Sequence, residues 1–159
     1  MDANMVAEEI LLTVEGVNQR LPLVRTIVRD IMELHRDIVM RKQRMISLRE
    51  RYPASGGDDS VYEQEVVQME GELIQDEQRL EEFAQELHQI GGTLTDAQMG
   101  VVDFPGDMDG ERVWLCWRSD EPEVLFWHSG DCGTSDRVSV YHAVNRSGYS
   151  TENELQQDA

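Results

Sequence analysis

His128 is the residue of this sequence with the clearest capacity for chemistry, because carboxylates surround it along the chain. Asp131 follows it by three positions, and Asp103 and Glu123 precede it in segments typical of strands. Imidazole and carboxylate groups together suit a divalent metal or a proton transfer near neutral pH. The chain has no H-E-x-x-H pair and is acidic throughout, so a half-buried histidine satisfied within a sheet is the competing interpretation. A divalent metal held by Asp103, Glu123, His128 and Asp131 is the alternative, and no other cofactor is expected.

Three tryptophans lie in the same polar and aromatic block as this histidine. Arg118 and Glu123 flank a Ser-Asp-Glu-Pro turn, and a hairpin closed by that turn would place them opposite each other. The same register pairs Trp114 with Trp127. The rings then either form an aromatic recognition surface with a charged rim or cover the helices beneath the sheet. The candidate binding residues are Trp114, Trp117, Arg118, Glu123, Trp127 and Arg137.

A third group of polar residues interrupts the apolar stripes of two predicted helices. His35 lies in the stripe of the first helix, and Asp76 and Glu77 interrupt the stripe of the second. In an antiparallel pair of these helices the two irregularities meet. Polar layers of this kind set the register of helical pairs, whereas one histidine and one carboxylate are too few ligands for a metal. We therefore expect His35, Asp76 and Glu77 to form a structural polar layer.

The residue pattern divides the chain into two helices followed by short strands. Apolar residues recur every three or four positions over residues 13–52, with a break expected near Pro22, and again over residues 60–91. The short connection favours an antiparallel, coiled-coil-like hairpin. Residues 100–142 change to short β-branched and aromatic segments separated by turn sequences, which predict a three- or four-stranded antiparallel meander. The expected fold class is α+β in a single domain over residues 1–144, and the polar residues 145–159 are expected to form a disordered tail.

The charge of the chain limits its partners. The net charge is −18, with +1 over residues 1–52, −11 over residues 53–99 and −8 over residues 100–159. Phosphate backbones and anionic membrane surfaces repel such a protein, so neither nucleic acid nor a membrane is expected as a partner. The amino terminus lacks the basic residues of a signal peptide, and Cys116 and Cys132 are too few for a disulfide framework, which favours the cytoplasm. Cys116 falls within a predicted strand and is expected to pack as a small apolar residue.

Two stretches of the chain carry a distinctive pattern. The first is TVEGVNQRLP at residues 13–22, and the second runs from GVVDFP at residues 100–105 through LCWR at 115–118 and EPEV at 121–124 to WH at 127–128. Both resemble a bacterial family known as domain-of-unknown-function family 2203, and the resemblance spans residues 10–138. After the WH pair the family pattern D-A-G-F-x-G-R is matched by Asp131, Gly133 and Arg137 without its aromatic residue. The resemblance implies a fold and no activity.

No complete catalytic signature accompanies these residues, since the chain has no P-loop, dinucleotide-binding glycine motif or nucleophile elbow. The sequence therefore favours a non-catalytic interaction or assembly module over an enzyme. The helices carry more apolar positions than one partner helix can cover, so the sheet, another protein or a second copy in a homodimer must cover the rest. A metal-binding protein or metal-dependent enzyme that uses the carboxylates around His128 is the alternative.

Overall fold

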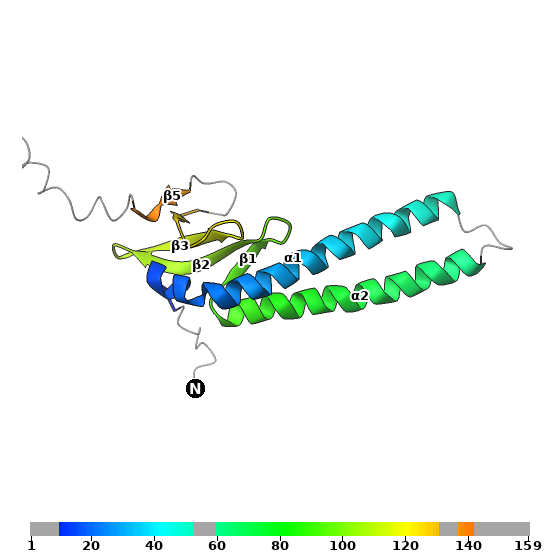
Figure 1. Ribbon diagram of the computed structural model, residues 1–159, viewed down its shortest axis with the longest axis horizontal. Coiled ribbons are helices and arrows are strands. Elements are labelled where there is room, and N and C mark those ends of the chain that lie inside the picture. Colours follow the sequence, from blue (N-terminus) through cyan, green and yellow to red (C-terminus); the bar gives the residue numbers. More distant parts are fainter. Residues whose placement is uncertain (1–9, 53–59, 131–136, 142–159) are drawn as a thin grey trace, which may run out of the picture.

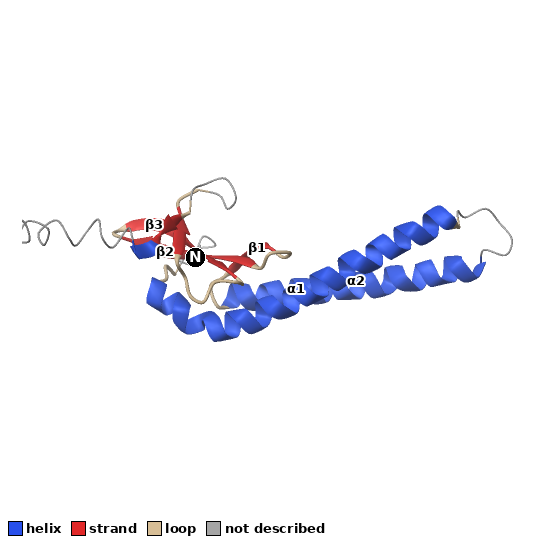
Figure 2. Ribbon diagram, turned by 45° about the horizontal axis from the view of Figure 1, so that its top comes forward, coloured by secondary structure: helices blue, strands red, loops and turns tan. Residues whose placement is uncertain are grey.

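The computed structural model describes residues 10–52, 60–130 and 137–141. Two long helices, α1 (Val14–Arg51) and α2 (Ser60–Gln89), lie side by side as an antiparallel hairpin (Figure 1). The strands are β1 (Thr93–Asp96), β2 (Val101–Met108), β3 (Glu111–Arg118), β4 (Phe126–His128) and β5 (Val138–Ser139). They form one antiparallel sheet in the order β1-β2-β3-β4-β5, which lies over the end of the hairpin where α1 begins and α2 ends (Figures 1 and 2). The α+β prediction is confirmed, with β1 as a strand that the sequence pattern did not indicate. The expected tail, residues 145–159, lies outside the described residues.

The first helix begins directly after Thr13, whose hydroxyl accepts a hydrogen bond from the Gly16 amide at 3.0 Å. This cap satisfies one of the free amides of the first turn. Pro22 lies inside α1 and the helix continues through it, so the expected break is wrong. A proline removes one backbone hydrogen bond. The burial of Leu21 and Val24 on either side of it, at 2% and 0% exposed, holds this part of the helix against the sheet.

Opposite charges join the two helices. The ion pairs are Arg41–Asp76, Lys42–Glu77, Arg44–Glu65 and Arg49–Glu70. Most of these side chains are partly exposed, and such pairs contribute only about 0–1 kcal/mol each. The pairs therefore set the alignment of the helices more than their stability.

The expected polar layer of His35, Asp76 and Glu77 is wrong. Asp76 pairs with Arg41 and Glu77 with Lys42, which lie six and seven residues after His35 along α1. The actual alignment of the helices brings long basic side chains to these carboxylates. His35 is half-buried and lines a hollow beside the turn between β1 and β2.

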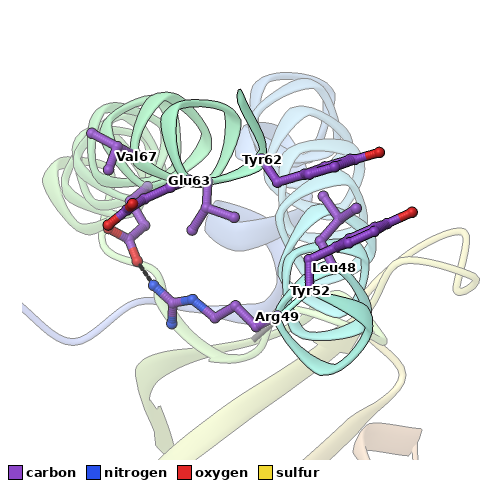
Figure 3. A pocket seen from close by; sticks show the side chains of 8 residues that line it. Leu48, Arg49, Tyr52, Tyr62, Glu63 and Val67 are labelled. Carbon is purple, nitrogen blue, oxygen red and sulfur yellow. Dashed lines mark hydrogen bonds and ion pairs between the residues drawn. The ribbon is translucent and has the colours of Figure 1, made fainter. Parts of the chain in front are cut away.

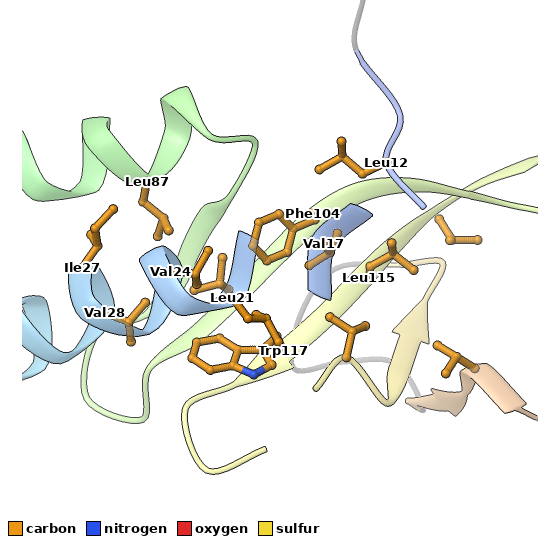
Figure 4. Close-up of a cluster of buried hydrophobic side chains, with 14 of the residues drawn as sticks. Leu12, Val17, Leu21, Val24, Ile27, Val28, Leu87, Phe104, Leu115 and Trp117 are labelled. Carbon is orange, nitrogen blue, oxygen red and sulfur yellow. The ribbon is translucent and has the colours of Figure 1, made fainter. Parts of the chain in front are cut away.

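One face of the sheet packs on the hairpin and forms the hydrophobic core (Figure 4). Its sheet residues Val102, Phe104, Leu115 and Trp117 meet the helix residues Val17, Leu21, Val24 and Leu87. Side chains alternate between the two faces of a strand. The residues between these core positions, Asp103 and Cys116, therefore project from the opposite face, which we call the outer face.

The segment before α1 lies along β2 and requires a glycine there. The Leu12 amide donates to the Pro105 carbonyl at 2.8 Å, and the Asp107 amide donates to the Leu12 carbonyl at 3.3 Å. A Cβ atom on Gly106 would lie 2.6 Å from the Leu115 Cγ atom and 3.0 Å from the Leu12 carbonyl oxygen. Glycine is therefore the residue that lets this segment approach the strand.

The pairing of β3 with β4 differs from the expected register by one residue. Trp114 lies opposite His128, and not opposite Trp127 as predicted. The strands are joined by residues 119–125, in which the Val124 amide donates to the Asn18 side-chain oxygen of α1 at 2.8 Å. This contact ties the connection to the helix, so that it does not close as a tight turn. A shift of one residue moves every side chain of β4 to the other face of the sheet.

The far end of the hairpin is closed by the stacked rings of Tyr52 and Tyr62, whose centroids are 3.8 Å apart (Figure 3). A hollow of about 310 Å³ lies beside them, and the ion pair of Arg49 and Glu70 lies within it. Apart from these two residues and Glu63 its lining is apolar or phenolic, so we assign it no chemistry. Among the described residues, neither helix has the length and apolar character needed to cross a membrane.

Candidate metal centre

Three buried side chains meet on the outer face of the sheet: Asp103 of β2, Cys116 of β3 and His128 of β4. Asp103 pairs with Cys116 and Trp114 pairs with His128, which directs all three to the same face. One ligand atom of each residue lies within 4.8 Å of the other two. The residues are 4%, 1% and 2% exposed, respectively. Ionisable groups so far from water need charge compensation within the cluster.

The orientation of His128 is set by two oxygen atoms. Its Nδ1 atom is 2.6 Å from the Gly130 carbonyl oxygen, and its Nε2 atom is 3.0 Å from Asp103 Oδ1. A carbonyl oxygen only accepts hydrogen bonds, so Nδ1 carries a proton and donates it. Nε2 then presents its lone pair to the carboxylate unless a second proton lies between them. Either that proton or a metal cation relieves the contact between two acceptors.

Without a bound metal, the thiol of Cys116 stays protonated near neutral pH. Burial raises its pKa to about 12, and the negative charge of Asp103 acts in the same direction. A metal cation would displace the proton, because the thiolate is the form that binds metals. A nucleophilic role does not fit the geometry. Nucleophilic cysteines have a lowered pKa and a neighbouring base, whereas both ring nitrogens of His128 face oxygen atoms.

A largely buried ion pair of Arg137 and Glu121 borders the cluster. Arg137 Nη2 lies 2.5 Å from Glu121 Oε1 and donates to the Cys116 carbonyl at 3.3 Å. Its guanidinium lies over the ring of Phe126, 4.3 Å from the centroid. Glu121 Oε1 also accepts from the Arg118 amide at 2.9 Å. These contacts hold the chain after β4 against β3 and fix the backbone position of Cys116.

The structure brings together two of the four residues predicted as metal ligands, Asp103 and His128. Glu123 is not part of the cluster, because its carboxylate accepts a hydrogen bond from the Tyr141 hydroxyl at 2.8 Å. Asp131 lies outside the described residues. Cys116 takes the third position, although it was expected to pack as an apolar residue. The wrong register of β3 and β4 hid it, since that register places Cys116 and His128 on opposite faces.

The tryptophans are divided between the two faces of the sheet. Trp117 is buried in the core, and its Nε1 atom donates to a backbone carbonyl at 3.0 Å. Trp127 packs against the same core, so covering the helices is the correct interpretation for both rings. Trp114 is half-buried on the outer face under the guanidinium of Arg112, 4.4 Å from its centroid. The candidate Arg118 is exposed. No single aromatic surface is formed by the described tryptophans.

A comparison with protein families supports the resemblance found in the sequence. The family described as uncharacterized conserved protein (DUF2203) matches residues 11–140, a range that contains Asp103, Cys116 and His128. No curated protein and no solved structure matches the chain. The chain therefore belongs to the DUF2203 family.

Proposed function

We propose that this protein binds a transition metal through Asp103, Cys116 and His128, and that Zn²⁺ is the ion that fits best. The observation that supports the proposal most is the 3.0 Å contact between His128 Nε2 and Asp103 Oδ1 beside the Cys116 thiol, inside a cluster closed to water. A cation at this point would take the place of a proton between the two atoms and form a metal–ligand bond to each. The cation would also stabilise the thiolate form of Cys116, which burial alone disfavours.

The chemistry of the ligands selects the metal. An imidazole nitrogen and a thiolate favour Zn²⁺ or a related transition metal, whereas Mg²⁺ and Ca²⁺ prefer oxygen ligands. Zinc bonds of about 2.0–2.2 Å place two ligands of a tetrahedral ion about 3.3–3.6 Å apart. The 3.0 Å between His128 Nε2 and Asp103 Oδ1 needs only a small separation to reach this range. The hydrogen bond from Nδ1 to the Gly130 carbonyl is of the kind that orients metal-binding histidines.

Charge balance supports a divalent ion. A thiolate, a carboxylate and a neutral imidazole together carry two negative charges, which a divalent cation neutralises. Because the ligands come from β2, β3 and β4, the ion would join three strands. A tetrahedral ion with three protein ligands keeps one position for water or a substrate atom. A centre that depends on a free thiolate suits a reducing compartment, so we place the protein in the cytoplasm.

Elemental analysis of untagged protein tests the proposal. We expect about one transition-metal ion per chain in the wild type, and at least a tenfold loss in Cys116→Ser and in His128→Ala. His88→Ala is the matched control, because His88 is an exposed histidine of α2 outside the cluster. Circular dichroism of each variant shows whether it has folded. A folded wild type that stays metal-free after reconstitution with Zn²⁺, or variants that keep their metal, would refute the proposal.

A second candidate function is a protein-interaction module. The hairpin exposes Val39 and Ile46 of α1 and Val67 and Ile74 of α2, all between 39% and 61% exposed. Each pair is spaced by seven residues and so lies on one side of its helix, which is typical of a helical face that packs against another helix. Sedimentation velocity tests for a homodimer, which Ile46→Glu and Ile74→Glu would dissociate. If the chain stays monomeric at every concentration, the homodimer is excluded.

A further inference from the structure

A groove runs along α1 beside the sheet. It consists of two adjoining hollows of about 390 and 380 Å³, which share Met32 and Arg36. α1 forms one wall from Arg25 to Met40, and the other wall contains Ser119 and the turn between β1 and β2. Sixteen residues of helix extend over about 22 Å, enough for about four turns of a second helix laid alongside. We call this feature the α1 groove.

The α1 groove holds positive charge that no carboxylate of the described residues neutralises through an ion pair. Arg41, Arg44 and Arg49 pair with carboxylates of α2. Arg29 and Arg36, by contrast, form no ion pair or hydrogen bond with any residue that the structure describes.

The groove has little internal compensation for this charge. Arg25 is also basic, and it donates to the backbone carbonyls of Glu121 and Pro122. Glu33 is the one acidic residue in the described lining. A locally cationic groove in a chain of net charge −18 favours an acidic partner.

The floor and rim of the groove are apolar. Met32 lies in both hollows, and Val28 lines the first. Met40 and Met99, which are 63% and 59% exposed, stand at the rim of the second. Methionine side chains are unbranched and adapt to different apolar surfaces, as in helix-binding grooves. The groove therefore combines an adaptable apolar strip with two available cations.

We propose that the α1 groove binds an acidic amphipathic helix of a partner protein. Arg29 and Arg36 are two helical turns apart, about 10.5 Å along the axis, and so meet carboxylates that are also seven residues apart. Leucine-like residues of the ligand helix pack on Met32 between these contacts and on Met40 one turn beyond Arg36. The inference rests on the interaction module proposed above. It specifies the binding site and the chemical character of the partner. It does not depend on the metal.

Binding of a designed peptide tests the inference. The probe is a fluorescent helix of about 18 residues, with leucine every third or fourth position and glutamate elsewhere, and its counterpart has lysine in place of glutamate. Fluorescence anisotropy with the full chain at about 0.15 M salt should show micromolar binding of the acidic probe alone. Arg29→Glu with Arg36→Glu should weaken this binding at least tenfold, and Met40→Glu should weaken it as well. Arg51→Glu with Arg79→Glu is the control with the same change of net charge, and it should leave the affinity within twofold.

The outcomes distinguish the proposed peptide site in the α1 groove from the general proposal of a protein-interaction module. Equal losses in the two double variants, equal binding of both peptides or no binding to folded wild type would overturn it. So would an association that Ile46→Glu abolishes and the double variant at Arg29 and Arg36 leaves intact, although that result would support an interaction module elsewhere on the hairpin. A homodimer that the double variant dissociates would make a second copy the occupant and would also overturn the inference.

Discussion

Removal and return of zinc should change the thermal stability of this protein by an amount that the structure allows us to work out. A ligand that binds only the folded state adds about 2.7 kcal/mol when its free concentration is one hundred times its Kd. For a chain of 159 residues, 1 kcal/mol corresponds to about 2–4 °C in Tm. We therefore expect Zn²⁺ at that concentration to raise the Tm of metal-free protein by about 5–11 °C. Differential scanning calorimetry of chelator-treated protein, with and without Zn²⁺, measures the shift.

Three comparisons make this result specific to the cluster. Mg²⁺ should produce no comparable shift, because it disfavours thiolate and imidazole ligands. Cys116→Ser and His128→Ala should lose most of the shift, and His88→Ala should keep it. A shift of the same size in His128→Ala would show that zinc acts at another place, which would refute the reasoning from Nε2 and the carboxylate of Asp103.

Hydrogen exchange can show which part of the protein Zn²⁺ stabilises. The proposed ligands tie β4 to β2 and β3, and β4 is only three residues long (Phe126–His128). Its amides should therefore exchange more slowly when Zn²⁺ is bound, whereas those in the half of the hairpin beyond the sheet should keep their rates. Uniform protection across both helices would indicate a general effect of the ion on folding and would count against a local centre.

Two further predictions concern the metal-free fold. In a Cys132→Ser background, Cys116 should react with iodoacetamide only as fast as the protein unfolds, because the thiol is buried and its pKa is about 12; rapid alkylation under native conditions would contradict this. Gly106→Ala should lower the free energy of unfolding by about 1–3 kcal/mol in urea titrations, since its Cβ atom would lie 2.6 Å from Leu115. Gly71→Ala is the matched control: its Cβ atom meets nothing within 4 Å on a helix, so it should raise that free energy by up to about 1 kcal/mol.

The helical hairpin could be predicted from the sequence because its determinants are local. Apolar residues at steps of three and four define each helix, and the excess of arginine in one and glutamate in the other predicts their contact. The detailed alignment was not predictable in this way. The interrupted apolar stripes predict that His35 lies near Asp76 and Glu77, whereas Asp76 pairs with Arg41 and Glu77 pairs with Lys42. Long, flexible basic side chains pair with carboxylates that do not lie directly opposite, so charge patterns define neighbouring helices but not neighbouring residues.

The sheet shows why a site can escape sequence analysis even when its residues are noticed. The sequence indicates Asp103 and His128 as potential ligands and predicts that Cys116 packs as a small apolar residue. The difference is one residue of register. The connection between β3 and β4 is held to α1 by the hydrogen bond from the Val124 amide to the Asn18 side chain. These two residues are 106 positions apart in the chain, and no local pattern encodes their contact. Face assignments in strands depend on register, so an error of one position exchanges ligands for core residues.

The position of the cluster is itself an argument for a cation. The hydrophobic core lies between the other face of the sheet and the helices, so the outer face could have been polar and exposed without loss of the core. Instead it buries a carboxylate, a thiol and an imidazole, groups that are costly to remove from water. An apolar trio of similar volume would pack there at lower cost. Natural sequences keep such locally unfavourable choices mainly where function requires them. The proposed divalent metal would give all three residues a common partner, whereas a proton shared by His128 and Asp103 would leave the Cys116 thiol without one.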